Sequence, residues 1–344
     1  MTTPDYISLE VTAVIAETHD SCSFELAVPP ELAERFHYRP GQFLTLRIPS
    51  GDDWLPRCYS LSSSPYAREN LRVTVKRVED GRGSNWLCDN VKPGDRVQVL
   101  VPAGVFVPKS LDGDFLLLAG GSGITPVLSI LRSVLSQAQG RVRLVYANRD
   151  ERSVIFQELL QGLVREHPER LQVVHWLNSL QGNPSVPQLA QLAAGFEHAQ
   201  AFICGPGPFM DASVEALKHA GLPGPAIHVE RFVSLPSESE QPVLSVVEHV
   251  GAAATRLTVE LDGNTHVIDC QEGEVLLAAM RREGLPAPNS CLVGSCATCM
   301  CTLVEGSVDL LRNDALDQQE LNEGWTLACQ AVATSDNVHL RFPE

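Results

Sequence analysis

The 344-residue sequence has little positive charge and no long apolar run. Lys and Arg number 26 against 42 Asp and Glu, so the formal net charge is −16. This balance disfavours nucleic acid as a partner, because its phosphates would be repelled. The most apolar segment, FLLLA at 115–119, is far shorter than the roughly 20 residues of a membrane-spanning helix. We therefore expect neither nucleic acid nor membrane as a partner.

The first residues, MTTPDYISLE, lack the basic start and apolar stretch of a secretory signal, so we expect a cytoplasmic location. Ten cysteines without such a signal favour metal or redox chemistry over disulfides. Residues 255–344 contain no lysine, and fourteen Asp and Glu against five Arg give them a balance of −9. This excess is compatible with solubility and with a docking face for a partner that carries a basic patch.

The chain is too long for one compact core, and its patterns change twice. Short alternating runs at 7–13, 23–28, 43–48, 71–78 and 96–101, separated by Pro-Gly and Gly-Asp turns, predict an antiparallel β-barrel. From residue 114, apolar strands at 115–119, 142–147, 171–177 and 201–204 alternate with helical patterns at 127–135, 155–166, 186–194 and 210–220. This alternation predicts a parallel sheet covered on both faces.

A polar segment bounded by prolines, 234–242, is typical of a linker. After it, strands at 257–261 and 266–270 flank an Asp-Gly-Asn turn and predict a hairpin, and a helical pattern follows at 275–282. We predict a β-barrel domain at 1–110, an α/β domain at 111–233, a linker at 234–254 and a third domain at 255–344.

The segment SCLVGSCATCMC, residues 290–301, contains four cysteines. Cys291, Cys296 and Cys299, followed by Cys329, match the C-x4-C-x2-C…C spacing of plant-type [2Fe–2S] centres. Small neighbours such as Gly294 let backbone N–H groups approach the sulfurs. Structural zinc prefers paired C-x2-C knuckles, and only one such pair occurs here. The spacing leaves Cys301, at the start of an apolar strand pattern, as a packed thiol.

Two motifs in the first domain favour flavin binding. Arg57, Tyr59 and Ser60 form R-x-Y-S, in which an arginine suits a phosphate, a tyrosine ring can lie on a flat cofactor and a serine can bond its edge. Downstream, GRGSNWL at 81–87 places glycines and a serine before a predicted helix, an arrangement that can hold a pyrophosphate on backbone N–H groups.

Two glycine-rich loops follow strands of the second domain. GGSGITP at 120–126 is not the G-x-G-x-x-G fingerprint, but a glycine turn after a buried strand still lets a phosphate approach a helix N-terminus. CGPGPFM at 204–210 follows a later strand in the same way. Both loops should open at the carboxyl edge of the sheet, where ligands bind.

The order of these five motifs resembles the ferredoxin–NADP reductase superfamily with a C-terminal plant-type ferredoxin domain. The resemblance covers essentially the whole chain and implies an N-terminal FAD-binding barrel, an α/β NAD(P)-binding domain and an α+β, β-grasp [2Fe–2S] domain. Within that superfamily the chain is similar to reductase components of multicomponent oxygenases. Segments such as RCYSLSSSP and YANRDERSVIF resemble the reductases of bacterial 3-ketosteroid 9α-hydroxylases, and those of phenylacetyl-CoA epoxidases more loosely.

The resemblance implies roles for individual residues. Along the FAD it places Arg57, Tyr59, Ser60, Lys76, Gly83, Ser84, Asn85 and Phe232. At the nicotinamide it places Gly121, Gly123, Thr125, Cys204, Gly205 and Pro206. At the cluster it places Cys291, Cys296, Cys299 and Cys329. Asn148 and Arg149 lie in the turn expected to face the adenosine ribose, where acidic residues favour NADH and arginines NADPH. Both kinds are present, and the resemblance favours NADH.

The implied activity is an NADH-dependent oxidoreductase without a catalytic triad. A hydride would enter at the FAD, and electrons would leave singly through the cluster to the Rieske non-haem iron centre of a separate terminal oxygenase. The leading hypothesis is the reductase of a 3-ketosteroid 9α-hydroxylase, active in steroid degradation. The alternatives are the reductase of a phenylacetyl-CoA or aromatic-compound oxygenase, a ferredoxin-like carrier or sensor without turnover of its own, and a zinc-stabilised structural protein.

Overall fold

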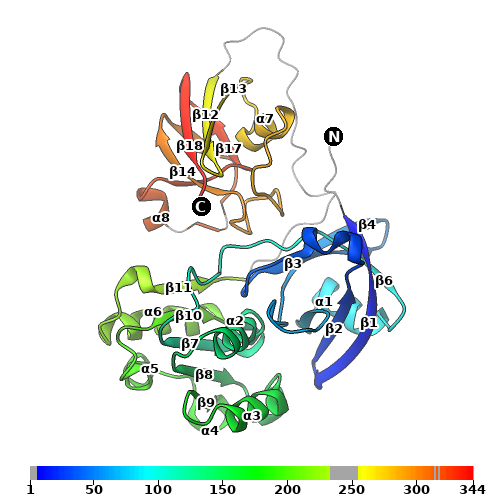
Figure 1. Ribbon diagram of the computed structural model, residues 1–344, viewed down its shortest axis with the longest axis vertical. Coiled ribbons are helices and arrows are strands. Elements are labelled where there is room, and N and C mark those ends of the chain that lie inside the picture. Colours follow the sequence, from blue (N-terminus) through cyan, green and yellow to red (C-terminus); the bar gives the residue numbers. More distant parts are fainter. Residues whose placement is uncertain (1–5, 233–254, 314, 317, 344) are drawn as a thin grey trace. The chain divides into compact units, whose positions relative to one another are not determined.

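The structure, a computed structural model, describes residues 6–232 and 255–343 apart from 314 and 317, so the predicted linker at 234–254 lies outside the described residues. The chain divides into two compact units (Figure 1). Residues 6–50 and 57–232 belong to one unit, and 255–343 belong to the other. Each unit has its own core and is described by itself.

Six strands form the N-terminal sheet. They are β1 (Ile7–Thr18), β2 (Ser21–Ala27), β3 (Phe43–Ser50), β4 (Asp53–Ser60), β5 (Leu71–Lys76) and β6 (Arg96–Val99), in the order β4-β3-β6-β1-β2-β5. The pairs β1–β2, β1–β6, β2–β5 and β3–β6 are antiparallel. An antiparallel bridge between Leu61, directly after β4, and Val73 of β5 joins the two edge strands, as in a barrel. Helix α1 (Arg82–Asn90) follows β5.

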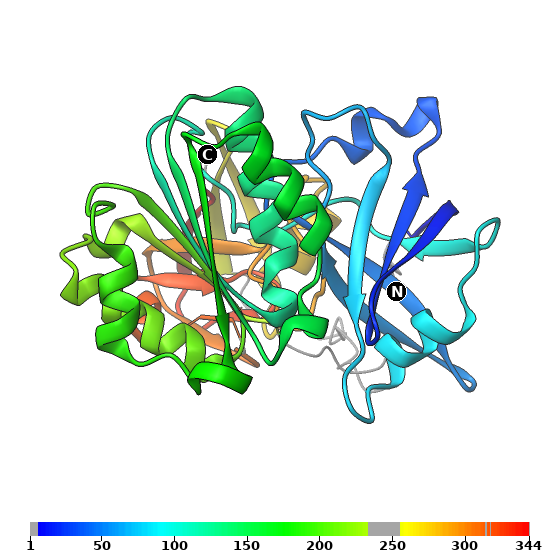
Figure 2. The same cartoon turned by 90° about the horizontal axis from the view of Figure 1, so that it is seen from below.

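The second sheet is parallel and has helices on both faces (Figure 2). Its strands are β7 (Phe115–Gly120), β8 (Val142–Asn148), β9 (Leu171–Leu177), β10 (Gln200–Cys204) and β11 (Ile227–Glu230), in the order β11-β10-β7-β8-β9. The helices are α2 (Ile124–Gln137), α3 (Gln157–Glu166), α4 (Asn178–Gln181), α5 (Val186–Ala193) and α6 (Gly207–His219). Every residue of β7 is buried, and its alternate side chains join the core beneath α2 and α3 or the one beneath α5 and α6.

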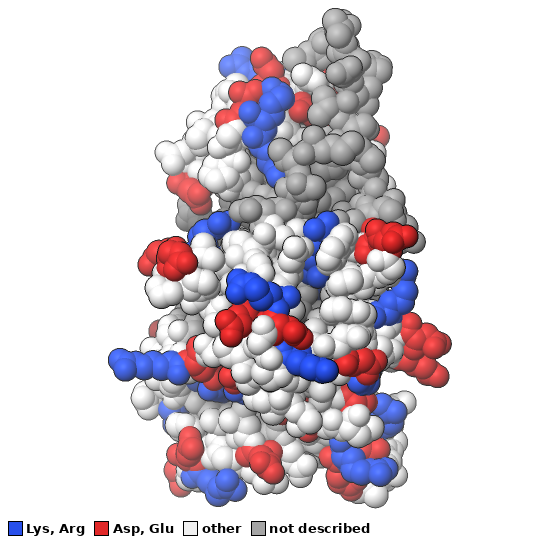
Figure 3. All heavy atoms as spheres, turned by 90° about the vertical axis from the view of Figure 1, so that its right-hand side faces the viewer, with Lys and Arg blue, Asp and Glu red and all other residues white. Residues whose placement is uncertain are grey.

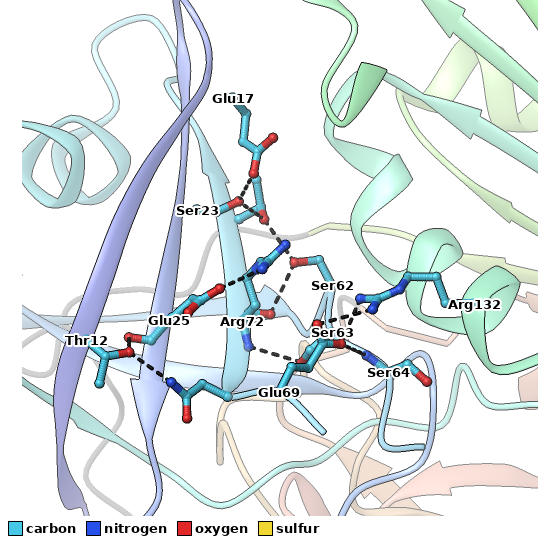
Figure 4. A network of polar contacts seen from close by, with 12 residues as sticks. Thr12, Glu17, Ser23, Glu25, Ser62, Ser63, Ser64, Glu69, Arg72 and Arg132 are labelled. Atoms are coloured by element: carbon cyan, nitrogen blue, oxygen red, sulfur yellow. Dashed lines mark hydrogen bonds and ion pairs between the residues drawn. The ribbon is translucent and has the colours of Figure 1, made fainter. Parts of the chain in front are cut away.

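Polar contacts hold helix α2 against the barrel (Figure 4). The Arg132 guanidinium donates to both carboxylate oxygens of Glu69, at 2.7 and 3.2 Å, and both side chains are mostly buried. Glu69 also accepts from the Ser64 N–H at 2.8 Å, and the Ser129 hydroxyl donates to the Ser63 carbonyl at 2.6 Å. Because α2 begins directly after the first glycine loop, these contacts fix that loop relative to the barrel.

The C-terminal unit is an α+β domain of the β-grasp type. Its elements are β12 (Thr255–Leu261), β13 (Asn264–Cys270), α7 (Leu276–Arg282), β14 (Met300–Glu305), β15 (Val308–Leu310), α8 (Gln318–Asn322), β16 (Trp325–Leu327), β17 (Ala331–Ala333) and β18 (Asn337–Arg341). The main sheet has the order β13-β12-β18-β14-β16, with β12 and β18 parallel, and β15 pairs with β17. The predicted hairpin is β12–β13, closed by Asp262 and Gly263, both with positive φ. The predicted fold class is therefore confirmed.

Surface features bear on possible partners. Among the described residues, no helix combines the length and the apolar character needed to cross a membrane. On the face seen in Figure 3, the acidic and basic side chains of the described residues are interspersed.

Candidate functional site

Four predicted thiols lie as two pairs in the C-terminal unit. The Cys296 side chain neighbours the Cys291 sulfur, which accepts from the N–H groups of Val293, Ser295 and Cys296, while the Cys296 thiol donates to the Thr298 hydroxyl at 3.2 Å. The Cys296 side chain and these N–H groups lower the pKa of Cys291 to about 6 even though the residue is buried. The loop before β14 thus directs N–H groups at a sulfur, an arrangement that stabilises a thiolate.

Cys299 and Cys329 form the second pair. Cys299 ends the loop, and Cys329 follows strand β16. Their thiols hydrogen-bond to each other, and this contact, together with burial, raises the pKa of Cys299 well above its ordinary value. The Ala328 N–H donates to the Cys299 carbonyl at 3.1 Å, so the backbone of the two segments is joined as well.

The grouping of the thiols fits a two-iron cluster. A [2Fe–2S] cluster has two irons, and four thiolates supply two to each. Cys291 neighbours Cys296, Cys299 neighbours Cys329, and Cys299 also interacts with Cys296. The four thiols therefore lie in one mostly buried region and fit the cluster.

Backbone geometry shapes the cysteine loop. Leu292, Gly294 and Ala297 all have positive φ, so the chain turns sharply between the cysteines. A Cβ on Gly294 would lie 2.7 Å from the Arg312 carbonyl oxygen. Glycine is therefore required here by its φ of +75° and by the close approach of a second segment.

Gln330 is a site residue that sequence reasoning missed. Its side chain is fully buried, and its Nε2 donates to the Leu292 carbonyl at 2.8 Å and to the Cys329 carbonyl at 2.9 Å. The residue thereby ties the cysteine loop to the segment of the fourth cysteine. A glutamine directly after Cys329, between apolar neighbours, is the signal that could have found it.

Cys301 lies on a strand of the main sheet, in the same domain core as Cys299 and Cys329. It is on β14 opposite Thr326, and its fully buried side chain belongs to the domain core. Burial raises its pKa, so it remains a neutral thiol. That Cys301 is not a ligand stays a prediction.

The R-x-Y-S motif lies on β4 next to helix α1. A Cβ on Gly83 would lie 3.1 Å from Cγ of Arg57, so the arginine side chain passes over the first turn of the helix. Ser60 is buried and Tyr59 is half-buried. Burial raises the pKa of the Tyr59 phenol, so its ring stays neutral. The structure therefore brings the two predicted flavin motifs together.

The other predicted flavin residues shape the turn after β5. The Ser84 hydroxyl accepts from the Val78 N–H at 3.1 Å, and the Asn85 amide donates to the Val78 carbonyl at 3.1 Å. Lys76 Nζ lies 3.7 Å from an Asp20 carboxylate oxygen. It also lies 3.8 Å from where a Cβ on Gly121 would be, which brings the end of β5 beside the first glycine loop.

The two glycine loops touch through their backbones. A Cβ on Gly123 would lie 2.1 Å from the Cys204 carbonyl oxygen, and one on Gly205 would lie 2.9 Å from the Gly120 Cα. Pro206 also approaches Gly120 closely, because a Cβ on Gly120 would lie 2.7 Å from Cδ of Pro206. The carboxyl ends of β7 and β10 thus form one narrow edge with no room for added side chains, as a site for a flat nucleotide requires.

Thr125 and Gly121 belong to the same edge. The Thr125 hydroxyl donates to the Ser122 carbonyl at 3.0 Å, and the side chain is buried. Gly121 has a φ of +52° and accepts a hydrogen bond from the Tyr146 hydroxyl at 3.2 Å. These contacts hold the first loop in shape.

Glu230 is a second residue that sequence reasoning missed. It pairs with Cys204 in the register of β10 and β11. Its Oε2 is shielded from solvent and meets no hydrogen-bond donor among the described residues. This desolvation raises the pKa of Glu230 to about 8, and burial and the Glu230 charge raise that of Cys204. An acid at the end of a short strand pattern, in VERF, is the signal that could have found it.

The remaining predicted residues lie at the ends of strands. Arg149 Nη2 is 3.6 Å from Oδ2 of Asp20, a barrel residue, and Asn148 is buried at the end of β8. Half of the Phe232 side chain is exposed. The structure therefore brings Arg149 to the acid that Lys76 also contacts, and leaves Phe232 half-exposed.

Comparisons with known proteins account for this arrangement. Residues 8–107 match the oxidoreductase FAD-binding domain, residues 117–215 the oxidoreductase NAD-binding domain and residues 259–334 the 2Fe-2S iron-sulfur cluster binding domain. The chain is 50% identical to the ferredoxin reductase component of 3-ketosteroid-9-alpha-monooxygenase from Rhodococcus rhodochrous, over 98% of this chain and 97% of that protein. It is 35% identical to a component of the 1,2-phenylacetyl-CoA epoxidase of Escherichia coli K12, over 97% of each.

The fold has a solved counterpart. The structure of phthalate dioxygenase reductase, described as modular for electron transfer from pyridine nucleotides to [2Fe-2S], matches with a TM-score of 0.61 and 26% identity, over 99% of this chain and all of that one. The chain belongs to the family of oxygenase reductase components with FAD-binding, NAD-binding and [2Fe–2S] domains. It is an electron-transfer oxidoreductase, and the predicted cofactors FAD, NAD(H) and a [2Fe–2S] cluster are confirmed.

Proposed function

We propose that the chain is the NADH-dependent reductase of a 3-ketosteroid 9α-hydroxylase and that its terminal oxygenase is a Rieske non-haem iron protein. The observation that carries this proposal is the 50% identity, over nearly the full length, to a reductase named for that oxygenase. The lower identity to the phenylacetyl-CoA epoxidase component makes that system the second candidate.

In this proposal the three predicted domains, 1–110, 111–233 and 255–344, each hold one group. Arg57 binds the flavin phosphates across the start of α1, Tyr59 covers the ring as a neutral phenol and Ser60 lies at its edge. Lys76, Gly83, Ser84 and Asn85 complete the phosphate side, and Phe232 supplies an apolar surface for the ring. When bound, the FAD takes a hydride's two electrons together and the cluster transfers them one at a time.

The nucleotide lies at the edge formed by the two glycine loops. Gly121, Gly123 and Thr125 keep one side narrow, and Cys204, Gly205 and Pro206 keep the other. Asn148 and Arg149 face the adenosine ribose. The ion pair of Arg149 with Asp20 supports NADH, because a guanidinium that already has a carboxylate neighbour is less available to a 2′-phosphate.

Cys291 and Cys296 bind one iron in this proposal, and Cys299 and Cys329 bind the other. The N–H groups directed at Cys291 stabilise its thiolate, and Gln330 keeps the loop and the fourth cysteine at the required separation.

Reconstitution tests the proposal. The purified holo-protein is combined in turn with the terminal components of a 3-ketosteroid 9α-hydroxylase, a phenylacetyl-CoA epoxidase and an aromatic-ring dioxygenase, and product is measured with NADH and with NADPH. We expect coupled product formation with the steroid oxygenase and NADH. Coupling only with another oxygenase would refute the partner, and a clear preference for NADPH would refute the nucleotide assignment.

A further inference from the structure

Two cysteines that the proposed electron path does not use lie together in the barrel unit. Cys22 is on β2, directly opposite Val75 of β5, and therefore on the same face of the sheet as that residue. Cys88 is on helix α1, with its sulfur 4.0 Å from the Val75 carbonyl oxygen. Both thiols are free and half-buried. Strand and helix thus present their thiols to each other around one residue of β5.

The thiols interact with each other and with one cation. Burial, with the neighbouring Cys22, raises the pKa of Cys88 to about 12. The guanidinium of Arg77 lies near enough to both sulfurs for their charges to interact, and it is held by Asp89 at 2.6 Å. A cation beside two thiols stabilises the thiolate that attacks an oxidant. Because burial raises the pKa of Cys88, we assign the first attack to Cys22.

We propose that Cys22 and Cys88 form a reversible disulfide, a modification site that fastens helix α1 to strand β2. The oxidant is a peroxide. The Cys22 thiolate attacks one peroxide oxygen, the O–O bond breaks, and with one proton the products are a sulfenic acid and water. The Cys88 sulfur attacks the sulfenic sulfur, the S–O bond breaks and a second water leaves. In sum, two thiols and one hydrogen peroxide give one disulfide and two waters.

The Cys22–Cys88 disulfide would attach to the helix that also carries part of the proposed flavin site. Helix α1 carries Gly83, Ser84 and Asn85 on its first turn, and Cys88 lies one turn after Ser84. A covalent link from this helix to β2 restricts any opening that separates the helix from the barrel. The oxidised protein should therefore release FAD several-fold more slowly. This part rests on the proposed flavin site, whereas disulfide formation does not.

Peptide mapping tests the site in the holo-protein. The protein is treated with hydrogen peroxide, remaining thiols are blocked with N-ethylmaleimide, and a tryptic digest is analysed by mass spectrometry. The cross-link would join the peptide 1–35 to the peptide 83–96. Cys22→Ser, Cys88→Ser and Cys22→Ala are compared with Cys270→Ser, which removes a buried thiol from the C-terminal unit. Flavin absorption confirms that each variant is folded.

We expect loss of two blockable thiols from the barrel unit and a dominant 1–35/83–96 cross-link in the wild type and in Cys270→Ser. Dithiothreitol should reverse both, and the Cys22 and Cys88 variants should lack the cross-link. Full blocking of both cysteines after peroxide treatment, or separate over-oxidation of each, would overturn the proposal. An unchanged FAD release rate in cross-linked protein would leave the disulfide standing and overturn its effect on the flavin site.

Discussion

Replacing Gln330 by methionine should weaken the cluster-binding domain through lost hydrogen bonds alone. Methionine has a similar volume but no donor, so the carbonyls of Leu292 and Cys329 each lose a buried partner. Only the bond to Leu292 joins the two segments, so at roughly 1 kcal/mol for that bond their separation becomes about 1 kcal/mol easier. Since about 1.4 kcal/mol corresponds to a factor of ten, cluster loss through that opening should accelerate roughly fivefold. Gln330→Ala adds a cavity and should be worse.

The assay is the decay of visible cluster absorbance in the purified holo-protein under an iron chelator. Gln318→Met is the matched control, because Gln318 is exposed and its amide donates to Asn322 in its own helix α8. Its decay should equal that of the wild type. If Gln330→Met also decayed at the wild-type rate, the inference that Gln330 holds the two cysteine segments together would be wrong.

Two further variants test the nucleotide edge. Gly123→Ala places a Cβ 2.1 Å from the Cys204 carbonyl oxygen, so the loops must separate and NADH-dependent flavin reduction should fall at least roughly tenfold. The control is Gly162→Ala on α3, where the nearest atom to an added Cβ is 4.0 Å away. It should keep full activity, and its free energy of unfolding should rise by up to about 1 kcal/mol. Equal rates in both would contradict the close approach. The pKa of Glu230 is raised to about 8 in the folded state, whereas the unfolded chain loses this proton near pH 4.5. The contribution of Glu230 to stability is therefore complete below pH 4.5 and is lost as the pH rises through 8. Relative to wild type, Glu230→Gln should therefore gain about 4 kcal/mol in unfolding free energy between pH 5 and pH 9; parallel pH curves would show that the carboxyl is not desolvated.

The parallel-sheet domain was the most predictable part of the fold. Its central strand β7 is covered on both faces and is a continuous apolar run, and β9 has the predicted bounds 171–177. The helix predicted from 155 begins at Gln157, because Phe156 adopts a left-handed φ of 62°. Strand β4 was not predicted: Pro56 interrupts its pattern, and its outer residues carry the flavin motif. Strands β15, β16 and β17 have three residues each, too few for a period to appear.

Some features of the candidate site could also be predicted from the sequence, and others could not. Cysteine spacing predicted which thiols gather, but not that Cys291 pairs with Cys296 and Cys299 with Cys329, since spacing carries no information about which sulfurs meet. The roles of Gln330 and Glu230 depend on contacts with segments distant in sequence or on neighbouring strands. Such contacts follow from the packing of the fold and leave no local pattern.

The path of electrons through the cluster to the oxygenase is tested most directly by comparing Cys329→Ser with Cys301→Ser in two assays. One measures NADH-dependent ferricyanide reduction, which requires the flavin and nucleotide domains but not the cluster, and the other measures steroid hydroxylation with the terminal oxygenase. We predict that Cys329→Ser keeps ferricyanide reduction and loses hydroxylation, whereas Cys301→Ser keeps both. Hydroxylation at the wild-type rate by Cys329→Ser would contradict the account.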